Sequence, residues 1–253
     1  MNDAKDNMFA TGHAADVDAA LAQLTLVIPV GPGDTLAPEL RLQLCDLPPH
    51  TCLRVVCARE TDATLLRAAM AVGKRPSNWE ILIAPAGRAT QQNFGARGAG
   101  TAYLWFLHAD SRLAGNTLAA LARFVASEER AMGYFDLRFL DDGPRLVRLN
   151  ELGAWVRSHW LGLPFGDQGL VLPRVAFEDL GGFATRLPSG EDHDLVLRAR
   201  RAGLPVRPLR AIVYTSARKY AERGWWRTTR EHLVATCRQA HRFSRVLRTP
   251  EGA

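Results

Sequence analysis

The feature that most constrains the fold of this chain is the alternation of short apolar runs with helical segments. Four runs rich in branched and aromatic side chains lack polar alternation, which is typical of strands buried on both faces of a parallel sheet. These runs are Leu24–Val30, Leu53–Cys57, Trp79–Ala84 and Ala102–Leu107. The helical patterns that follow them span 38–46, 62–72, 90–97 and 117–129. The alternation predicts an α/β fold with right-handed crossovers: a doubly wound, mostly parallel sheet flanked by helices.

The second half of the chain is less regular but continues in the same style. Strands are predicted over 134–139, 168–172 and 206–214, and helices over 145–160, 191–201 and 224–245. A length of 253 residues suits one α/β domain. We expect a disordered lead-in over 1–22 and a single domain over 23–246, with one half at 23–112 and the other at 113–246.

From the composition we expect neither a membrane-spanning nor a disordered protein, and from the first residues we expect neither a signal peptide nor an anchor. The chain is 47% hydrophobic and 23% charged, which is ordinary for a folded domain. It has no run of about 18 apolar residues, so no transmembrane helix is predicted. The first 20 residues are acidic and lack the apolar segment of a signal peptide or anchor. The four cysteines form no CxxC pair, so free thiols and a cytoplasmic location are expected.

Positive charge is concentrated at the C-terminal end. Residues 186–253 contain 15 Lys/Arg and 6 Asp/Glu, which suggests an anionic partner such as a diphosphate or a lipid surface. Trp225 and Trp226 accompany the arginines of 224–248, a composition suited to peripheral contact with an anionic membrane. The alternative is a helix packed on the domain with its arginines in water. No nucleic-acid-binding motif is present, so no nucleic-acid partner is expected.

Polar side chains follow the predicted strands at the points where these strands end. In doubly wound sheets, ligands bind beyond the carboxyl ends of the strands. His108 and Asp110 follow the fourth run directly, and Asp110 there suits a hard divalent cation held jointly with a diphosphate. The alternative is that Asp110 only caps the turn into the next helix.

Three further groups stand next to predicted elements. Glu191 and Asp192 open a helix, where a carboxylate can act as a general base for a hydroxyl or, with Ser189, form a capping box. Arg218 and Lys219 follow the last strand and either neutralise a departing diphosphate or belong to the solvated surface. Asp167 precedes a strand and suits either a ligand contact or a turn.

Taken together and in order, these pieces resemble the family 2 glycosyltransferases of GT-A fold, from about Leu24 to about Phe243. The resemblance is closest to the subgroup labelled radical-SAM/selenodomain-associated, or arsenosugar-biosynthesis, glycosyltransferases. The matching stretches are Ile28–Val30, Gly87–Asn93 with Gly95 and Ala96, Phe106–Asp110, Gly166–Gln168, Leu180–Phe183, Glu191–Asp192 and Thr215–Arg218. No single stretch is specific to this family, but the set of stretches in this order is.

The resemblance implies an inverting hexosyltransferase that moves a sugar from a nucleotide-diphosphate sugar to a small or lipid-linked acceptor. It implies Asp192, beside Glu191, as the base, and Asp110 as the ligand of Mn²⁺ or Mg²⁺. Donor contacts are implied for Arg88, Gln91, Asn93, His108, Asp110, Arg218 and Lys219, and acceptor contacts for Asp167 and Gln168. The half at 23–112 would bind the nucleotide sugar, and the half at 113–246 would carry the acceptor site and a helical C-terminal extension.

The chain departs from the family pattern where the nucleotide base is read. The family's second strand usually ends in Asp-Gly-Gly-Ser, whereas this chain has Cys57-Ala-Arg-Glu60. A weak preference for uridine is therefore expected unless Glu60 or Asp62 reaches the base. The alternative function is a non-catalytic relative of the same fold that binds a nucleotide sugar or a lipid phosphate.

Overall fold

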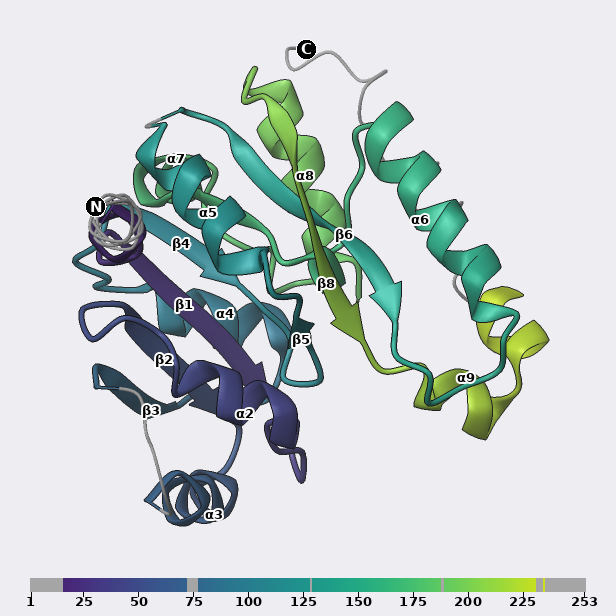
Figure 1. The fold of residues 1–253 in the computed structure, drawn as a ribbon, viewed down its shortest axis with the longest axis horizontal. Helices are drawn as coiled ribbons and strands as arrows, with labels where there is room; N and C mark the ends of the chain where they lie inside the picture. Colours follow the sequence, from purple (N-terminus) through teal and green to yellow (C-terminus); the bar gives the residue numbers. More distant parts are fainter. Residues whose placement is uncertain (1–15, 72–76, 128, 188, 231–233, 235–253) are drawn as a thin grey trace, which may run out of the picture.

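One mixed, curled sheet of eight strands runs through the molecule, with helices on both faces (Figure 1). This computed structural model describes residues 16–71, 77–127, 129–187, 189–230 and 234. The strands are β1 (Leu24–Val30), β2 (Cys52–Cys57), β3 (Trp79–Ile83), β4 (Tyr103–Phe106), β5 (Arg112–Leu113), β6 (Met132–Phe139), β7 (Val171–Pro173) and β8 (Val206–Thr215). The helices are α2 (Pro38–Leu44), α3 (Glu60–Ala71), α4 (Arg88–Ala96), α5 (Thr117–Ala126), α6 (Val147–Trp160), α7 (Arg174–Asp179), α8 (Glu191–Arg201) and α9 (Arg218–Arg223), with a 3-10 turn, η1, at Gly166–Gln168.

The strand order determines which chain segments meet at one edge of the sheet. The order is β3-β2-β1-β4-β7-β6-β8-β5, and β1 to β4 are mutually parallel. Strand β7 is antiparallel to both β4 and β6, and β6 is parallel to β8. Six strands (β1 to β4, β6 and β8) therefore end at the same edge, and β7 begins there. Segments far apart in sequence are placed together at this edge.

Successive side chains of β1 point to opposite faces of the sheet, and each face is covered by its own layer of apolar side chains. Leu26 and Ile28 face a layer built with α2, α3 and α5, whereas Val27 faces a layer built with α4, α7 and α8. A Cβ on Gly95 of α4 would lie 2.5 Å from Val27 Cγ1 and 2.9 Å from Val56 Cγ2. Glycine at this position, near the end of α4, therefore lets the helix lie close against β1 and β2.

The predicted α/β fold is confirmed, and the first four strands agree with their predicted runs to within one residue at each end. One correction concerns Gln168, for which the pattern predicts the start of a strand. It instead closes the 3-10 turn, and the strand begins at Val171. The reason is Gly169, whose positive φ of 63° turns the chain between the two.

The predicted disordered lead-in over 1–22 is corrected only at its end, since residues 1–15 lie outside the described residues. Residues 16–21 are helical, and the side chains of Ala20 and Leu21 are buried in the larger apolar layer. Burial of these two side chains orders the last turn before β1, which charge content alone does not predict. Of the predicted helix over 224–245, residues 225–230 are helical, and most of the rest lies outside the described residues. Within the described residues, no helix is both long and apolar enough to cross a membrane.

Candidate active site

Most of the residues singled out in the sequence lie along the edge where the strands end. His108 and Asp110 follow β4, Glu191 and Asp192 begin α8, and Asp167 lies in η1 ahead of β7. Arg218 and Lys219 begin α9, directly beyond β8. Because β7 is antiparallel to its neighbours, its beginning lies at the same edge as the end of β4.

Asp192 occupies the centre of this cluster. Its Oδ2 accepts a hydrogen bond from the Gly166 backbone N–H at 2.6 Å, and its Oδ1 accepts one from the His193 N–H at 2.8 Å. Burial acts to raise the pKa of Asp192, but the Gly166 hydrogen bond and the charges of His193 and Arg88 outweigh it, so this pKa lies below its ordinary value. The carboxylate is therefore ionised and fixed in direction.

The structure also separates the two interpretations of the Glu191–Asp192 pair. The N-cap of α8 is Gly190, in the left-handed conformation, and no side chain caps the helix. Asp192 bonds instead to Gly166, which lies 26 residues away in sequence. A capping box does not account for this carboxylate.

His108 lies beside Asp192 across Gly166. A Cβ on Gly166 would lie 3.1 Å from Asp192 Oδ2 and 3.2 Å from His108 Nε2, so a larger residue would push against both side chains. Burial, reinforced by the charge of Arg88, lowers the pKa of His108 to about 3. The imidazole is therefore neutral at physiological pH. Its Nε2 is buried and has no hydrogen-bond partner within the described residues, so it is available to a ligand.

Asp167 is the third acidic group of the cluster and differs from Asp192 in its protonation. Burial raises the pKa of Asp167 to about 6, Arg157 opposes the rise, and Asp192 and Asp110 add to it. Its Oδ1 is buried without a hydrogen-bond partner among the described residues. Three carboxylates from three separate segments thus share one electrostatic environment.

Asp167 and His108 give opposite pH dependences of stability. The pKa of Asp167 is about 6 in the folded state and about 3.9 in the unfolded state. Its contribution to stability is therefore fully present below about pH 3.9 and is lost as the pH rises through about 6. The pKa of His108 is about 3 in the folded state and about 6.5 in the unfolded state. Its contribution to stability is therefore present above about pH 6.5 and is lost as the pH falls from there towards about 3. Over about pH 4 to 6 the two effects oppose each other.

We predict that Asp167→Asn stabilises the protein at pH 7.5 by about 1–2 kcal/mol and leaves it unchanged at pH 4. Asparagine removes a charge that is costly to bury and keeps the shape of the side chain. Urea unfolding of both proteins in EDTA at the two pH values checks this. Asp179→Asn, at an exposed carboxylate paired with Arg130, is the control. A gain that is equal at both pH values would show that the buried charge of Asp167 is not its cause.

Arg157 of α6 is the cation with the largest effect on the pKa of Asp167. Its Nε donates to the Leu163 carbonyl at 2.9 Å, its Nη2 donates to Gln168 Oε1 at 3.2 Å, and its Cζ lies 3.2 Å from the centre of the Phe165 ring. Burial lowers the pKa of Arg157, while Asp167 and Asp192 raise it. Neither the helical pattern of α6 nor the spacing of its charges marks Arg157 as facing inward, so sequence reasoning missed it.

Basic groups lie around the carboxylates. Arg88 Nη1 lies 3.6 Å from Glu191 Oε1, and Glu191 is almost fully buried. Lys219 is exposed at the start of α9, and its positive charge contributes to lowering the pKa of His108. Arg218 is exposed beside it. Tyr220, buried one residue further on, has its pKa raised to about 12 by burial and by Asp167. The start of α9 therefore lies at the same cluster.

Three residues expected to contact ligands are instead committed to the scaffold. Gln91 Nε2 donates to the Val30 and Val56 carbonyls, both at 2.7 Å, which ties α4 to the ends of β1 and β2. Asn93 donates to the Phe183 carbonyl and accepts from the Phe183 N–H, both at 2.8 Å. Gln168 is fully buried and bonds to Phe135, Phe165 and Arg157. Their amides are occupied, so we do not assign them to donor or acceptor.

The region where the nucleotide base was expected also differs from the family pattern. Cys57 is fully buried in the larger apolar layer, and burial, with a contribution from Asp62, raises the pKa of its thiol to about 11. Asp62, in the first turn of α3, instead reaches the rim, where its Oδ2 accepts the Gly33 N–H at 3.2 Å. Glu60 on the same turn is paired with Arg67 at 2.7 Å.

Asp110 remains as the candidate cation ligand. Its Oδ2 accepts a long hydrogen bond from Thr215 Oγ1, at 3.5 Å, which leaves most of the carboxylate's capacity for ligands open. The described residues contain no group of three His, Cys, Asp or Glu able to hold a metal ion by themselves. Mg²⁺ and Mn²⁺ commonly use one or two carboxylates together with substrate phosphates and water. Asp110, with the unpaired oxygen of Asp167 in the same cluster of described residues, fits that mode.

Comparison with known proteins supports the fold assignment. No profile of a known protein family and no curated protein matches the chain. Among solved structures, S. aureus TarS 1-349 in complex with UDP-GlcNAc is 17% identical, with a TM-score of 0.58 over 76% of this chain and 58% of that one. The mannosyltransferase PcManGT from Pyrobaculum calidifontis, in complex with GDP-Man and Mn²⁺, is 18% identical, with a TM-score of 0.60 over 91% of this chain and 66% of that one. This chain thus spans about three-fifths of TarS 1-349 and two-thirds of PcManGT.

The TM-scores show that this chain, with its curled sheet flanked by helices, shares its overall fold with both neighbours. Because the sequence identity is low, the similarity establishes the fold alone, and the function depends on the residues of the site.

Proposed function

We propose that this protein is an inverting glycosyltransferase that moves a hexosyl group from a nucleotide-diphosphate sugar to a hydroxyl acceptor, with Asp192 as the base. We also propose membership in the radical-SAM/selenodomain-associated subgroup that its motifs resemble, and a cytoplasmic location. The observation that carries the proposal is the Asp192 carboxylate, held ionised by two backbone N–H groups beside a neutral His108, with Asp167 acted on by the charges of both Asp192 and Asp110. A pure binding protein has no need of a positioned base.

In the proposed reaction, Asp192 takes the proton of the acceptor hydroxyl as its oxygen attacks the anomeric carbon of the donor sugar. The bond from that carbon to the diphosphate oxygen breaks, and the nucleoside diphosphate leaves from the opposite face. Arg88 and Lys219, with Arg218, offer positive charge to the departing diphosphate. Asp167, whose Oδ1 has no hydrogen-bond partner among the described residues, would contact the acceptor, and His108 beside Asp192 would contact the donor.

A divalent cation, when bound, would polarise the diphosphate and make it a better leaving group. Asp110 would hold it, with the donor's phosphates as further ligands. The structure of PcManGT contains Mn²⁺ together with GDP-Man, which makes manganese the first ion to test.

The direct test is release of nucleoside diphosphate from candidate donors. The protein is incubated with Mn²⁺ and either UDP-GlcNAc or GDP-Man, the donors present in the neighbours' structures, and free UDP or GDP is measured with and without simple sugar acceptors. Turnover supports the transferase. Binding of a donor without any release of diphosphate would favour the alternative, a non-catalytic relative that binds nucleotide sugars.

The nucleotide preference gives a separate prediction. We expect UDP and GDP to bind within about tenfold of each other, roughly 1.4 kcal/mol. The reason is that Asp62 accepts hydrogen bonds without distinguishing the ring N–H of uracil from that of guanine. Asp62→Ala should weaken both nucleotides by about 0.5–1.5 kcal/mol, because the ring N–H would lose one hydrogen-bond acceptor at this exposed rim.

Calorimetric titration of both nucleotides into wild type, Asp62→Ala and Glu60→Ala checks this prediction. Glu60 is the matched control, since it lies on the same helical turn but is paired with Arg67. A wild-type preference for UDP above about a hundredfold would mean that another group reads the base.

A further inference from the structure

The outer side of α6 is apolar, which is unusual for a helix at the surface of a domain. Leu149, Leu152, Val156 and Trp160 follow one another at intervals of three and four residues, so they form one stripe along the helix. Leu149, Leu152 and Trp160 are 57%, 60% and 74% exposed. A water-facing helix normally shows polar residues on this side.

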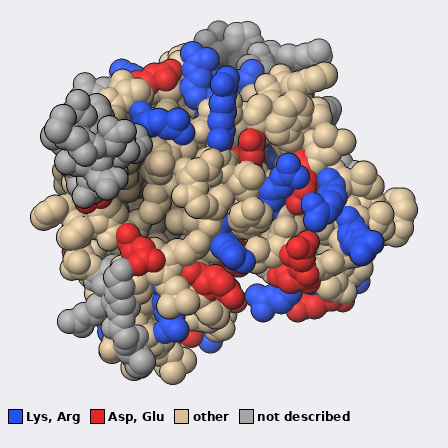
Figure 2. Space-filling view, in the orientation of Figure 1, with Lys and Arg blue, Asp and Glu red and all other residues tan. Residues whose placement is uncertain are grey.

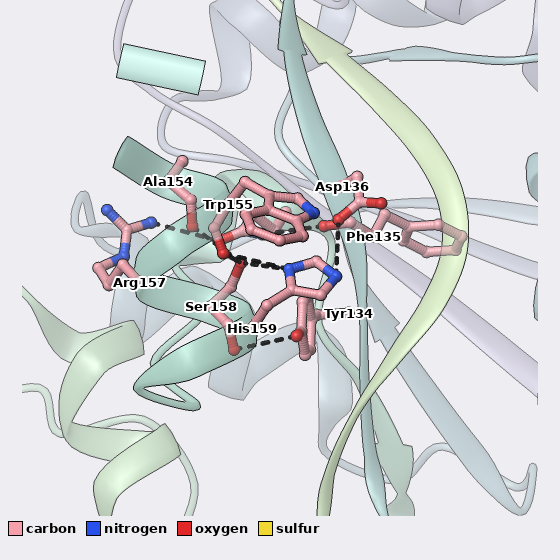
Figure 3. Close-up of polar contacts among 9 residues, drawn as sticks. Tyr134, Phe135, Asp136, Ala154, Trp155, Arg157, Ser158 and His159 are labelled. Atoms are coloured by element: carbon pink, nitrogen blue, oxygen red, sulfur yellow. Dashed lines mark hydrogen bonds and ion pairs between the residues drawn. The ribbon is translucent and has the colours of Figure 1, made fainter. Parts of the chain in front are cut away.

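The polar and buried side chains of α6 face the domain instead. Figure 3 shows this side: Tyr134 Oη on β6 donates to the Ser158 carbonyl at 3.0 Å, and Asp136 Oδ1 on β6 lies 3.5 Å from His159 Nε2. Trp155 stacks on the His159 ring at 4.6 Å. These contacts hold α6 in a fixed orientation, so its apolar stripe is presented outward as a rigid feature and is not a product of local fraying.

A second exposed tryptophan lies close to the first half of α6. The Trp225 indole N–H donates to Asn150 Oδ1 at 2.7 Å, and Asn150 Nδ2 donates to Thr229 Oγ1 at 3.2 Å. These bonds fasten residues 225–230 to α6. Trp226, on that segment, is 78% exposed.

The surroundings of the stripe are basic. Residues 141–161 and 216–230 contain eight Lys/Arg and four Asp/Glu, and Figure 2 shows Lys and Arg side chains gathered on the side where α6 and α9 lie, with acidic groups between them. Of the four acidic residues, Glu151 is buried against Arg138 and Asp142 accepts hydrogen bonds from Ser216 and Ala217. Arg157 also faces inward, towards the candidate site. Seven basic and three acidic residues remain, so the charge presented outward is positive.

We infer that this face, the α6 stripe with its basic border, docks the protein on the surface of an anionic lipid bilayer. Leucine and tryptophan along one side of a helix, bordered by arginine, are the composition that enters the boundary between headgroups and acyl chains. A second copy of the chain fits less well, because a two-fold pairing through the stripe would set the basic border against itself. The inference concerns α6, within the described residues, and does not depend on the transferase activity.

The test is cosedimentation of the full chain with phosphatidylcholine vesicles containing about 30% phosphatidylserine, at low salt. The triple variant Leu149→Gln, Leu152→Gln, Trp160→Gln should lower vesicle affinity on the order of a hundredfold. The matched control is Leu42→Gln, Leu65→Gln, Val175→Gln, which removes three side chains that are 64%, 71% and 56% exposed elsewhere on the surface. Thermal melts of both triple variants should match the wild type, since none of the six side chains is buried.

The charge component is tested with Arg145→Gln, Arg148→Gln, which should weaken binding to anionic vesicles about fivefold for each arginine and leave neutral vesicles unaffected. The inference is overturned if the wild type does not sediment with anionic vesicles, or if both triple variants lose binding equally. It is also overturned if light scattering shows a wild-type dimer that the α6 variant dissociates, because the stripe would then be a contact between copies.

Discussion

Asp192→Asn is expected to reduce turnover by at least about a hundredfold while donor affinity stays close to that of the wild type. The carboxamide has the same shape but cannot take a proton from an acceptor hydroxyl. Asp192 does not line the expected nucleotide region at Gly33 and Asp62, so binding of the nucleoside diphosphate should be preserved. Single-turnover measurements with saturating donor, together with nucleotide titrations, separate the two effects.

The same substitution carries a structural cost that has to be measured. The amide nitrogen of asparagine would face one of the two N–H groups, of Gly166 or His193, that the carboxylate now accepts. A lost hydrogen bond of this kind costs about 1–3 kcal/mol, so the melting temperature should fall modestly. Asp179→Asn is again the control for removing one charge. Turnover near the wild-type level in a folded Asp192→Asn protein would reject Asp192 as the base.

Asp110→Ala is expected to abolish the part of nucleotide binding that depends on a divalent cation. In the wild type, UDP or GDP should bind at least about tenfold more tightly with Mn²⁺ than with EDTA, a difference of roughly 1.4 kcal/mol. The variant should bind equally in both conditions, at the EDTA level. The bond that Asp110 accepts from Thr215 is long, so its removal should leave the fold intact.

A thermal-shift series with and without Mn²⁺ measures this coupling directly. Nucleotide at about a hundred times its dissociation constant stabilises the folded state by about 2.7 kcal/mol. Glu39→Ala, at an exposed carboxylate in the first turn of α2, is the control and should keep the metal effect. Equal nucleotide affinity in Mn²⁺ and EDTA for the wild type would exclude Asp110 as a ligand of a substrate-bound cation.

Local patterns in the sequence were sufficient for most of the fold. Each of the first four strands is a short apolar run, and each following helix has its own periodicity, so their positions depend on neighbours a few residues away. The end of β4 just ahead of His108 and Asp110, and the start of α8 at Glu191, were predicted for the same reason. By contrast, the order of Ala20 and Leu21 depends on burial in a layer made by distant segments.

The chemical state of the site was decided only by the tertiary structure. Asp167 and Asp192 are both aspartates near glycines in the sequence. Their pKa values shift in opposite directions, because Asp192 accepts two N–H groups whereas Asp167 Oδ1 is buried without a partner among the described residues. Similarly, Gln91 and Asn93 match a motif by residue type, yet their amides bond to backbone groups of β1, β2 and Phe183.

The sequence by itself therefore determined most of the elements, the edge of the sheet where a site was expected, and the acidic residues near it. The tertiary structure decided which side chains face the site, added Arg157 to it, and turned the apolar stripe of α6 outward. The physical reason is the separation along the chain between the residues that interact. Strand and helix patterns arise from contacts within a few residues, whereas direction, burial and charge state depend on groups brought together from segments tens of residues apart.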